Sequence, residues 1–135
     1  MPDLSLSGWQ ILVVEDENEL AHMVAMVLGG PAANLTTAAN GWEALMRIGA
    51  ASQPFDVVIT DHRMPRMTGL DLVRRLRTQN FGGKILVLSA HLSDEVIREY
   101  DELSVDMMMT KPFDFDELQE AMAFLNKKPS VLAGA

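Results

Sequence analysis

Residues 57–65 read VVITDHRMP, and this stretch indicates what kind of sheet the chain forms. The segment Val57–Thr60 has the composition of a buried strand, and it runs directly into Asp61. Pro65 then favours a turn. A strand without alternating polar residues is typical of a parallel sheet that is covered on both faces. The role of Asp61 therefore depends on what ends the other strands.

The rest of the chain repeats this arrangement of a short apolar run followed by a helical pattern. We expect helices to begin after the N-cap candidates Thr68, Ser93 and Asp114, and Gly29–Pro31 to end the first helix. The alternation of strands and helices predicts a doubly wound α/β fold around a five-stranded parallel sheet. The remaining predicted strands are residues 11–14, 35–38, 85–88 and 107–109.

Composition limits the classes of function that need to be considered. The 135 residues fit one domain, which we expect at 10–126, with an N-terminal extension at 1–9 and a tail at 127–135. The net charge of −8 argues against direct binding of nucleic acid, which needs a basic surface. No apolar run approaches the ~18 residues of a membrane span. The absence of Cys agrees with a reducing compartment, and we expect a cytoplasmic protein without membrane insertion.

Polar residues follow four of the five predicted strands. Ligands of an open parallel sheet bind outside the carboxyl ends of its strands, so chemistry is expected at this edge. A hydroxyl, an ammonium group and three carboxylates gather there. In chain order, the strand ends carry Glu15 and Asp16, then Asp61, then Ser89, and finally Thr110, Lys111 and Pro112.

This set of groups predicts a phosphoryl-binding site. Three neighbouring carboxylates repel one another, and a hard cation relieves the repulsion. An all-oxygen ligand set without His or Cys suits Mg²⁺ or Mn²⁺. Lys111 adds a positive charge and Ser89 a hydrogen bond to an oxygen, which leaves Asp61 as the carboxylate nucleophile.

Each of these residues also has an ordinary structural interpretation. Asp16 with Glu19 has the spacing of a capping box, and Asp61 could simply start a turn. Ser89 could bond the backbone, and Lys111 could be a solvated surface charge. Independent structural causes would rarely place all four at strand ends, so the joint placement favours the functional interpretation.

The ordered set of motifs resembles the receiver domain of two-component response regulators, of the chemotaxis-Y-like kind. The resemblance covers roughly residues 10 to 126 and implies a flavodoxin-like (βα)₅ fold with strand order 2-1-3-4-5. Asp16 and Asp61 would then flank the point where the strand order reverses. The motifs are ILVVEDE (11–17), NGWEAL (40–45), VVITDHRMPRMTG (57–69), ILVLSA (85–90) and TKPF (110–113).

The resemblance also implies a metal site. In the family, Asp16 would bind Mg²⁺ directly, together with Asp61 and the backbone carbonyl of Arg63. Glu15 would act mainly through water. These assignments follow from the family's motif.

The same resemblance implies a phosphoryl chemistry. Asp61 would be the phosphoacceptor, and Ser89 and Lys111 would contact the phosphoryl oxygens. The donor would be a phosphohistidine on a sensor histidine kinase or a histidine phosphotransfer protein. The peptide bond between Lys111 and Pro112 is usually cis in this family.

The chain departs from the family at its expected switch. The family usually has Tyr or Phe three residues before the lysine, where this chain has Met108, so an aromatic switch is in doubt. Met108 and Tyr100 are our candidate switch or output residues, on the face formed by the fourth helix, fifth strand and fifth helix. Arg63 and His91 border the site, where the family tunes the lifetime of the phosphoryl group, although both can equally be ordinary loop residues.

Two other functions compete with this interpretation. A haloacid-dehalogenase-type phosphatase also places an Asp after an apolar strand, but it needs a second Asp where this chain has Arg63. An interaction module that works without phosphorylation would tolerate a damaged acidic pocket, and this one is intact. We therefore expect a signalling protein with only self-catalysed phosphotransfer and dephosphorylation. It would act as a stand-alone monomer or weak dimer that docks on a downstream protein, or as a receiver excised from a longer protein.

Overall fold

The computed structural model describes residues 8–28 and 34–127. Its five strands form one parallel sheet in the order β2-β1-β3-β4-β5, which confirms the predicted fold class and strand order. The stop signal Gly29–Pro31 and the tail from residue 128 lie outside the described residues. The strands are β1 (Gln10–Val14), β2 (Asn34–Ala38), β3 (Val57–Asp61), β4 (Lys84–Ser89) and β5 (Met107–Thr110).

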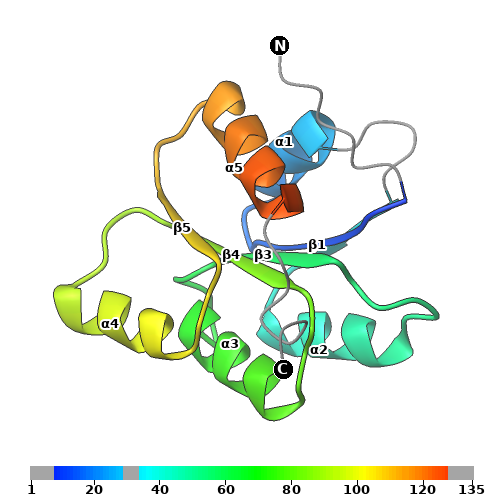
Figure 1. The fold of residues 1–135 in the computed structure, drawn as a ribbon, viewed down its shortest axis with the longest axis horizontal. Helices are drawn as coiled ribbons and strands as arrows, with labels where there is room; N and C mark the ends of the chain where they lie inside the picture. The colour runs from blue at the N-terminus through cyan, green and yellow to red at the C-terminus, as the bar shows by residue number, and fades with distance from the viewer. Residues whose placement is uncertain (1–7, 29–33, 128–135) are drawn as a thin grey trace.

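Helices cover both faces of the sheet (Figure 1). On one face lie α1 (Asn18–Leu28) and α5 (Phe115–Lys127); on the other lie α2 (Gly41–Ala50), α3 (Gly69–Thr78) and α4 (Asp94–Glu102). The central strands β3 and β4 are buried along their whole length, as their apolar sequences predict. Alternate strand residues contribute to two separate apolar cores, one on each face. Within the described residues, every helix is too short or too polar to cross a membrane.

The predicted caps begin three of these helices. Thr68 and Asp71 form a reciprocal capping box at α3, with hydrogen bonds of 3.1 and 3.2 Å between each side chain and the other's backbone N–H. The Ser93 hydroxyl accepts the Val96 N–H at 3.2 Å, and Asp114 accepts the Glu117 N–H at 2.8 Å. These caps orient α3 and α4 directly after the loops that leave the carboxyl edge of the sheet.

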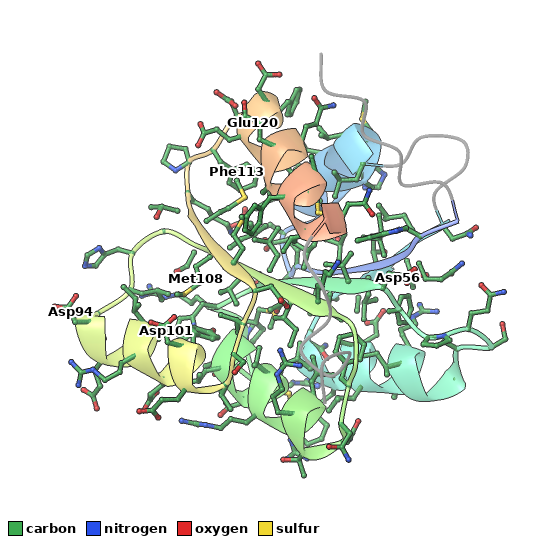
Figure 2. The ribbon with its side chains drawn as sticks, viewed as in Figure 1. Asp56, Asp94, Asp101, Met108, Phe113 and Glu120 are labelled. Carbon is green, nitrogen blue, oxygen red and sulfur yellow. The ribbon has the colours of Figure 1, made fainter. Side chains whose placement is uncertain are left out.

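Charged residues at the opposite, amino edge of the sheet bind backbone groups. Lys84 is 9% exposed, and its ammonium group donates to the carbonyl of Leu125 in the last turn of α5. It also lies 5.3 Å from the centre of the Trp9 ring. Asp56, labelled in Figure 2, accepts the backbone N–H of Gln10 at 2.7 Å. These contacts join strands and helix ends that are distant in sequence.

Candidate functional site

The polar residues predicted from the strand ends come together at the carboxyl edge of the sheet. Asp61 is the last residue of β3 and Ser89 the last of β4, while Glu15 and Lys111 directly follow β1 and β5. The Lys111 ammonium nitrogen lies 3.2 Å from a carboxylate oxygen of Glu15 and 3.2 Å from one of Asp61. Charged groups at the ends of β1, β3 and β5 therefore form one cluster, and Ser89 ends the strand β4 that lies between β3 and β5.

Three carboxylates in this cluster fit a hard cation. Glu15, Asp16 and Asp61 offer oxygen atoms that all lie within 4.8 Å of one another. Glu15 and Asp61 are 3% and 8% exposed, whereas Asp16 faces solvent. Convergent oxygen donors with one open side match the preference of Mg²⁺ for carboxylates and water. The cluster thus agrees with the expected metal site.

The local backbone separates Asp16 from the helix that follows. The helix α1 begins at Asn18, so Asp16 lies upstream of it. A carboxylate oxygen of Glu15 accepts the Glu17 N–H at 3.1 Å. This geometry does not support the interpretation of Asp16 as an N-cap, and it leaves the Asp16 side chain at the open side of the cluster.

The electrostatics of the cluster follow from burial and charge together. Burial raises the pKa of Glu15 and the charge of Asp61 raises it further, against the opposing effects of the Glu17 N–H and Lys111. Burial alone would lower the pKa of Lys111, but the neighbouring carboxylates of Asp61 and Glu15 outweigh it and raise that pKa. Lys111 therefore remains a stable cation beside the predicted nucleophile.

A cavity on the α4 side of the site contains one of the two predicted switch residues, Met108, in its lining. Ser89, His91 and Met108 line a space of about 270 Å³ between the β4–α4 loop, α4 and β5. Met108, labelled in Figure 2, packs on the core beneath α3 and α4, whereas Met107 and Met109 pack on the opposite core. The Lys111–Pro112 peptide bond is cis, as expected. Arg63 is exposed, and the metal-ligand role of its carbonyl stays a prediction.

One site contact was not anticipated from the sequence. The Nδ1 atom of His62, directly after Asp61, lies 2.6 Å from the hydroxyl oxygen of Tyr100 on α4. Burial lowers the pKa of His62, and burial together with the charges of Asp61 and Asp71 raises the pKa of Tyr100. The His62 imidazole and the Tyr100 phenol therefore share one hydrogen bond. The signal that could have revealed His62 is its position beside a strand-terminal carboxylate.

The comparisons with known proteins assign this arrangement to a class of signalling domain. Residues 11–123 match the family described as the response regulator receiver domain. The chain belongs to this family and is a receiver domain of two-component signalling systems.

Named relatives and solved structures agree with this assignment. The chain is 37% identical over 123 residues to the probable transcriptional regulatory protein TcrX of Mycobacterium tuberculosis, covering 90% of this chain and 51% of that protein. It is 33% identical over 121 residues to the two-component response regulator PhoP of Pseudomonas aeruginosa, covering 90% and 53%. The chain thus spans about half the length of these relatives. The chemotaxis response regulator CheY4 of Vibrio cholerae superposes with a TM-score of 0.79 at 30% identity, over 88% of this chain and 99% of that one.

Proposed function

We propose that Asp61 accepts a phosphoryl group from a phosphohistidine on a sensor histidine kinase or a histidine phosphotransfer protein. The observation that carries this proposal is the position of Asp61 at the end of β3, 3.2 Å from the Lys111 ammonium group and within the acidic cluster. A carboxylate nucleophile, a cation and a potential metal site then share one edge. Family membership supports the proposal.

The transfer is a single displacement at phosphorus. A carboxylate oxygen of Asp61 donates an electron pair to phosphorus and forms the new O–P bond. The P–N bond of the donor breaks, and its electron pair stays with the imidazole, which is protonated on its other nitrogen and leaves as a neutral ring. Lys111 and Ser89 stabilise the negative charge of the phosphoryl oxygens from two sides of the pocket.

Mg²⁺ is the cation that we assign to the acidic cluster, with Mn²⁺ as a substitute. Asp16, Asp61 and the Arg63 carbonyl would hold it directly, and Glu15 would act through water. The metal would offset the charge of the carboxylates and of the incoming phosphoryl group. A haloacid-dehalogenase-type phosphatase needs an acidic residue at the position of Arg63. We therefore assign the chain a signalling function and not the hydrolysis of small phosphate esters.

The surface beside the site suits a protein donor. A groove of about 660 Å³ runs between α1 and α5, and Met23, Met26 and Phe115 contribute apolar surface to it. Met26 is 82% exposed and Phe115 53% exposed. Both helices begin shortly after site residues in the chain, so the groove starts near the carboxyl edge of the sheet.

We place the output at the face formed by α4, β5 and α5. The cavity between Ser89 and Met108 gives Ser89 room to move toward the phosphoryl group, and Met108 can repack without an aromatic rotamer change. Phosphorylation would shift an existing equilibrium of this face. The target of this face is a downstream protein in the cytoplasm. The net negative charge of the chain disfavours direct binding of nucleic acid, although some relatives are named as transcriptional regulators.

The proposal is tested by labelling with a small phosphodonor and Mg²⁺. Intact-mass and peptide mass spectrometry of the wild type should find one phosphoryl group, on Asp61, and Asp61→Asn should remain unmodified. Asp56→Asn, at the opposite edge of the sheet, is the matched control and should be labelled like the wild type. Equal labelling of another carboxylate in the wild type, or labelling of Asp61→Asn, would overturn the assignment.

A further inference from the structure

The helix α4 inserts one side chain fully into the interior of the molecule. All of α4 lies within the described residues, and Tyr100 is its one buried residue, at 0% exposure. The neighbouring helix α3 buries five residues. Val96 of α4 is only partly buried against the same core, so Tyr100 makes the deepest contact of α4 with the interior.

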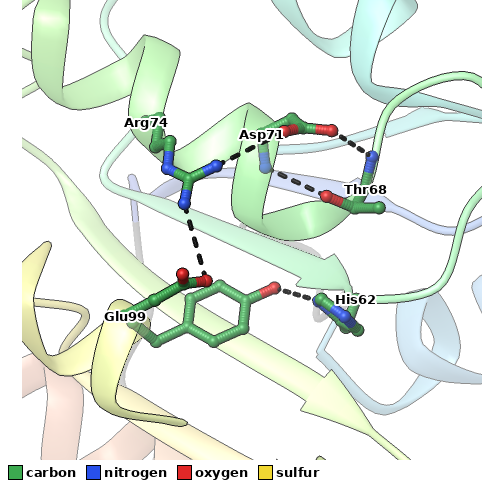
Figure 3. Close-up of polar contacts among 6 residues, drawn as sticks. His62, Thr68, Asp71, Arg74 and Glu99 are labelled. Carbon is green, nitrogen blue, oxygen red and sulfur yellow. Dashed lines mark hydrogen bonds and ion pairs between the residues drawn. The ribbon is translucent and has the colours of Figure 1, made fainter. Parts of the chain in front are cut away.

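The Tyr100 hydroxyl reaches past α3 to the loop that follows the phosphoacceptor. It lies 2.6 Å from Nδ1 of His62, and the two rings meet edge to face at 76° with centroids 5.5 Å apart (Figure 3). Gly69 leaves room for this approach, because a Cβ there would lie 2.9 Å from the Tyr100 hydroxyl oxygen. The same Cβ would crowd the carbonyl of Asp61.

The backbone of His62 is fixed at both of its polar groups. Its N–H donates to the Leu88 carbonyl at 3.1 Å, and its carbonyl accepts the Gly69 N–H at 2.8 Å. The side-chain bond to Tyr100 adds a third restraint, and this one comes from α4. Because His62 lies between Asp61 and Arg63, fixing His62 also limits the motion of the peptide units on either side of it.

A second connection to α4 is exposed. Glu99 forms an ion pair with Arg74 of α3 at 3.5 Å, and Arg74 also lies 3.7 Å from Asp71 of the capping box (Figure 3). These side chains are about half exposed, so their contribution is small and is screened by salt. The bond from Tyr100 is partly buried and is therefore the stronger link between α4 and the site.

We propose that Tyr100 is a positioning residue of the phosphoacceptor site. Through His62 it holds the Asp61–Arg63 turn in the geometry that binds metal and phosphoryl group, and it makes the position of α4 depend on the occupancy of that site. The inference rests on the proposed function of Asp61. Because coupling between two sites is reciprocal, a change in α4 must also change the affinity of the site.

The direction of the effect follows from the geometry. The three carboxylates converge within 4.8 Å while the turn is restrained, so the proposal takes this restrained turn as the geometry that binds the ligand. Without the hydrogen bond the turn samples more conformations, and ligand binding has to order it. Loss of the Tyr100 hydroxyl should therefore weaken binding at the site.

The experiment measures the affinity for beryllofluoride with Mg²⁺ in the wild type and four variants. Tyr100→Phe keeps the ring and should bind about 3- to 10-fold more weakly than the wild type, as expected for one lost hydrogen bond. His62→Phe should show the same loss, and the double variant should be no weaker than either single variant, because both remove one bond. Glu99→Gln, the adjacent α4 residue, is the control and should stay within about twofold.

A spectroscopic readout separates this role from a general loss of stability. The chain has a single tyrosine, so selective ¹³C labelling of the tyrosine ring gives one signal, from Tyr100. In the wild type this signal and the α4 amides should shift on addition of beryllofluoride. In His62→Phe the signals of the α4 amides should no longer shift when beryllofluoride binds. Urea unfolding of this variant confirms that it is folded.

The outcomes distinguish the two proposals. Binding by the wild type with equal or tighter binding by Tyr100→Phe would overturn the positioning role and leave the proposed function standing. Additive losses in the double variant would also overturn it, because the two side chains would then act separately. Failure of the wild type to bind beryllofluoride would overturn the proposed function and this inference with it.

Discussion

Buried charge lies at both ends of the sheet, but it has different partners at each end. At the amino edge, Lys84 donates to a helix carbonyl and Asp106 accepts the N–H of Ile85 at 2.8 Å. At the carboxyl edge, Glu15, Asp61 and Lys111 contact one another. Charges that bind backbone groups complete the secondary structure, whereas charges that face one another leave an edge open to a ligand.

This difference has an energetic consequence. A buried polar group that satisfies a backbone partner supports folding, and its removal leaves that partner unpaired. The three carboxylates of the carboxyl edge outnumber the one ammonium group of Lys111, so they retain a net repulsion that reduces stability. The amino edge should therefore lose stability when its charges are removed, and the carboxyl edge should gain stability when its repulsion is relieved.

The largest effect is expected at the amino edge, from Lys84→Met. The substitution keeps most of the apolar stem but leaves the Leu125 carbonyl without this donor and removes the cation near the Trp9 ring. We expect a loss of about 2–3 kcal/mol in the free energy of unfolding, measured by urea denaturation.

Two controls make this result specific. Arg98→Met, an exposed cation on α4, should change stability by less than about 0.5 kcal/mol. Phosphoryl labelling of folded Lys84→Met should match the wild type, because the substitution lies at the far edge of the sheet. Unchanged stability of Lys84→Met would show that its contact with α5 is not structural.

The sequence predicted the carboxyl edge better than the amino edge, for a physical reason. Parallel strands align their carboxyl ends, so polar residues after apolar runs identified Glu15, Asp61, Ser89 and Lys111 without any knowledge of side-chain contacts. Lys84 begins a strand, and its partner Leu125 is distant in the chain, so no local pattern reveals the bond. Long-range contacts of this kind depend on how a helix packs.

The contact between His62 and Tyr100 escaped prediction for the same reason. The sequence offers Tyr100 as a candidate switch or output residue, and in the structure its ring is fully buried and its hydroxyl lies beside His62. Helical periodicity predicts the face of a residue but not the polar group that its side chain reaches. The close approach of the Tyr100 hydroxyl to His62 also needs the absence of a side chain at Gly69. From the sequence alone, Gly69 indicates only a turn.

The second prediction concerns metal at the carboxyl edge. Mg²⁺ that binds the folded chain should raise the free energy of unfolding by about 1.4 kcal/mol when its concentration is about tenfold above the dissociation constant. Lys84→Met should show the same increment, since its edge takes no part in binding. Asp61→Asn should lose the increment, and a full increment in that variant would place the cation elsewhere.

The smallest effect is expected from Asp16→Asn without metal. Asp16 is exposed and shares the acidic cluster, so neutralising it removes repulsion, and stability should rise by less than about 1 kcal/mol. The rise should shrink in about 1 M salt, where the Debye length is about 3 Å. Urea denaturation with a chelator at low and high salt measures both changes.

Asp56→Asn is the matched control at the amino edge, where weakening the bond to the Gln10 N–H should lower stability. If Asp16→Asn instead destabilises the metal-free protein, Asp16 makes a favourable contact in the folded chain, and the contrast between the two edges would not hold at that position.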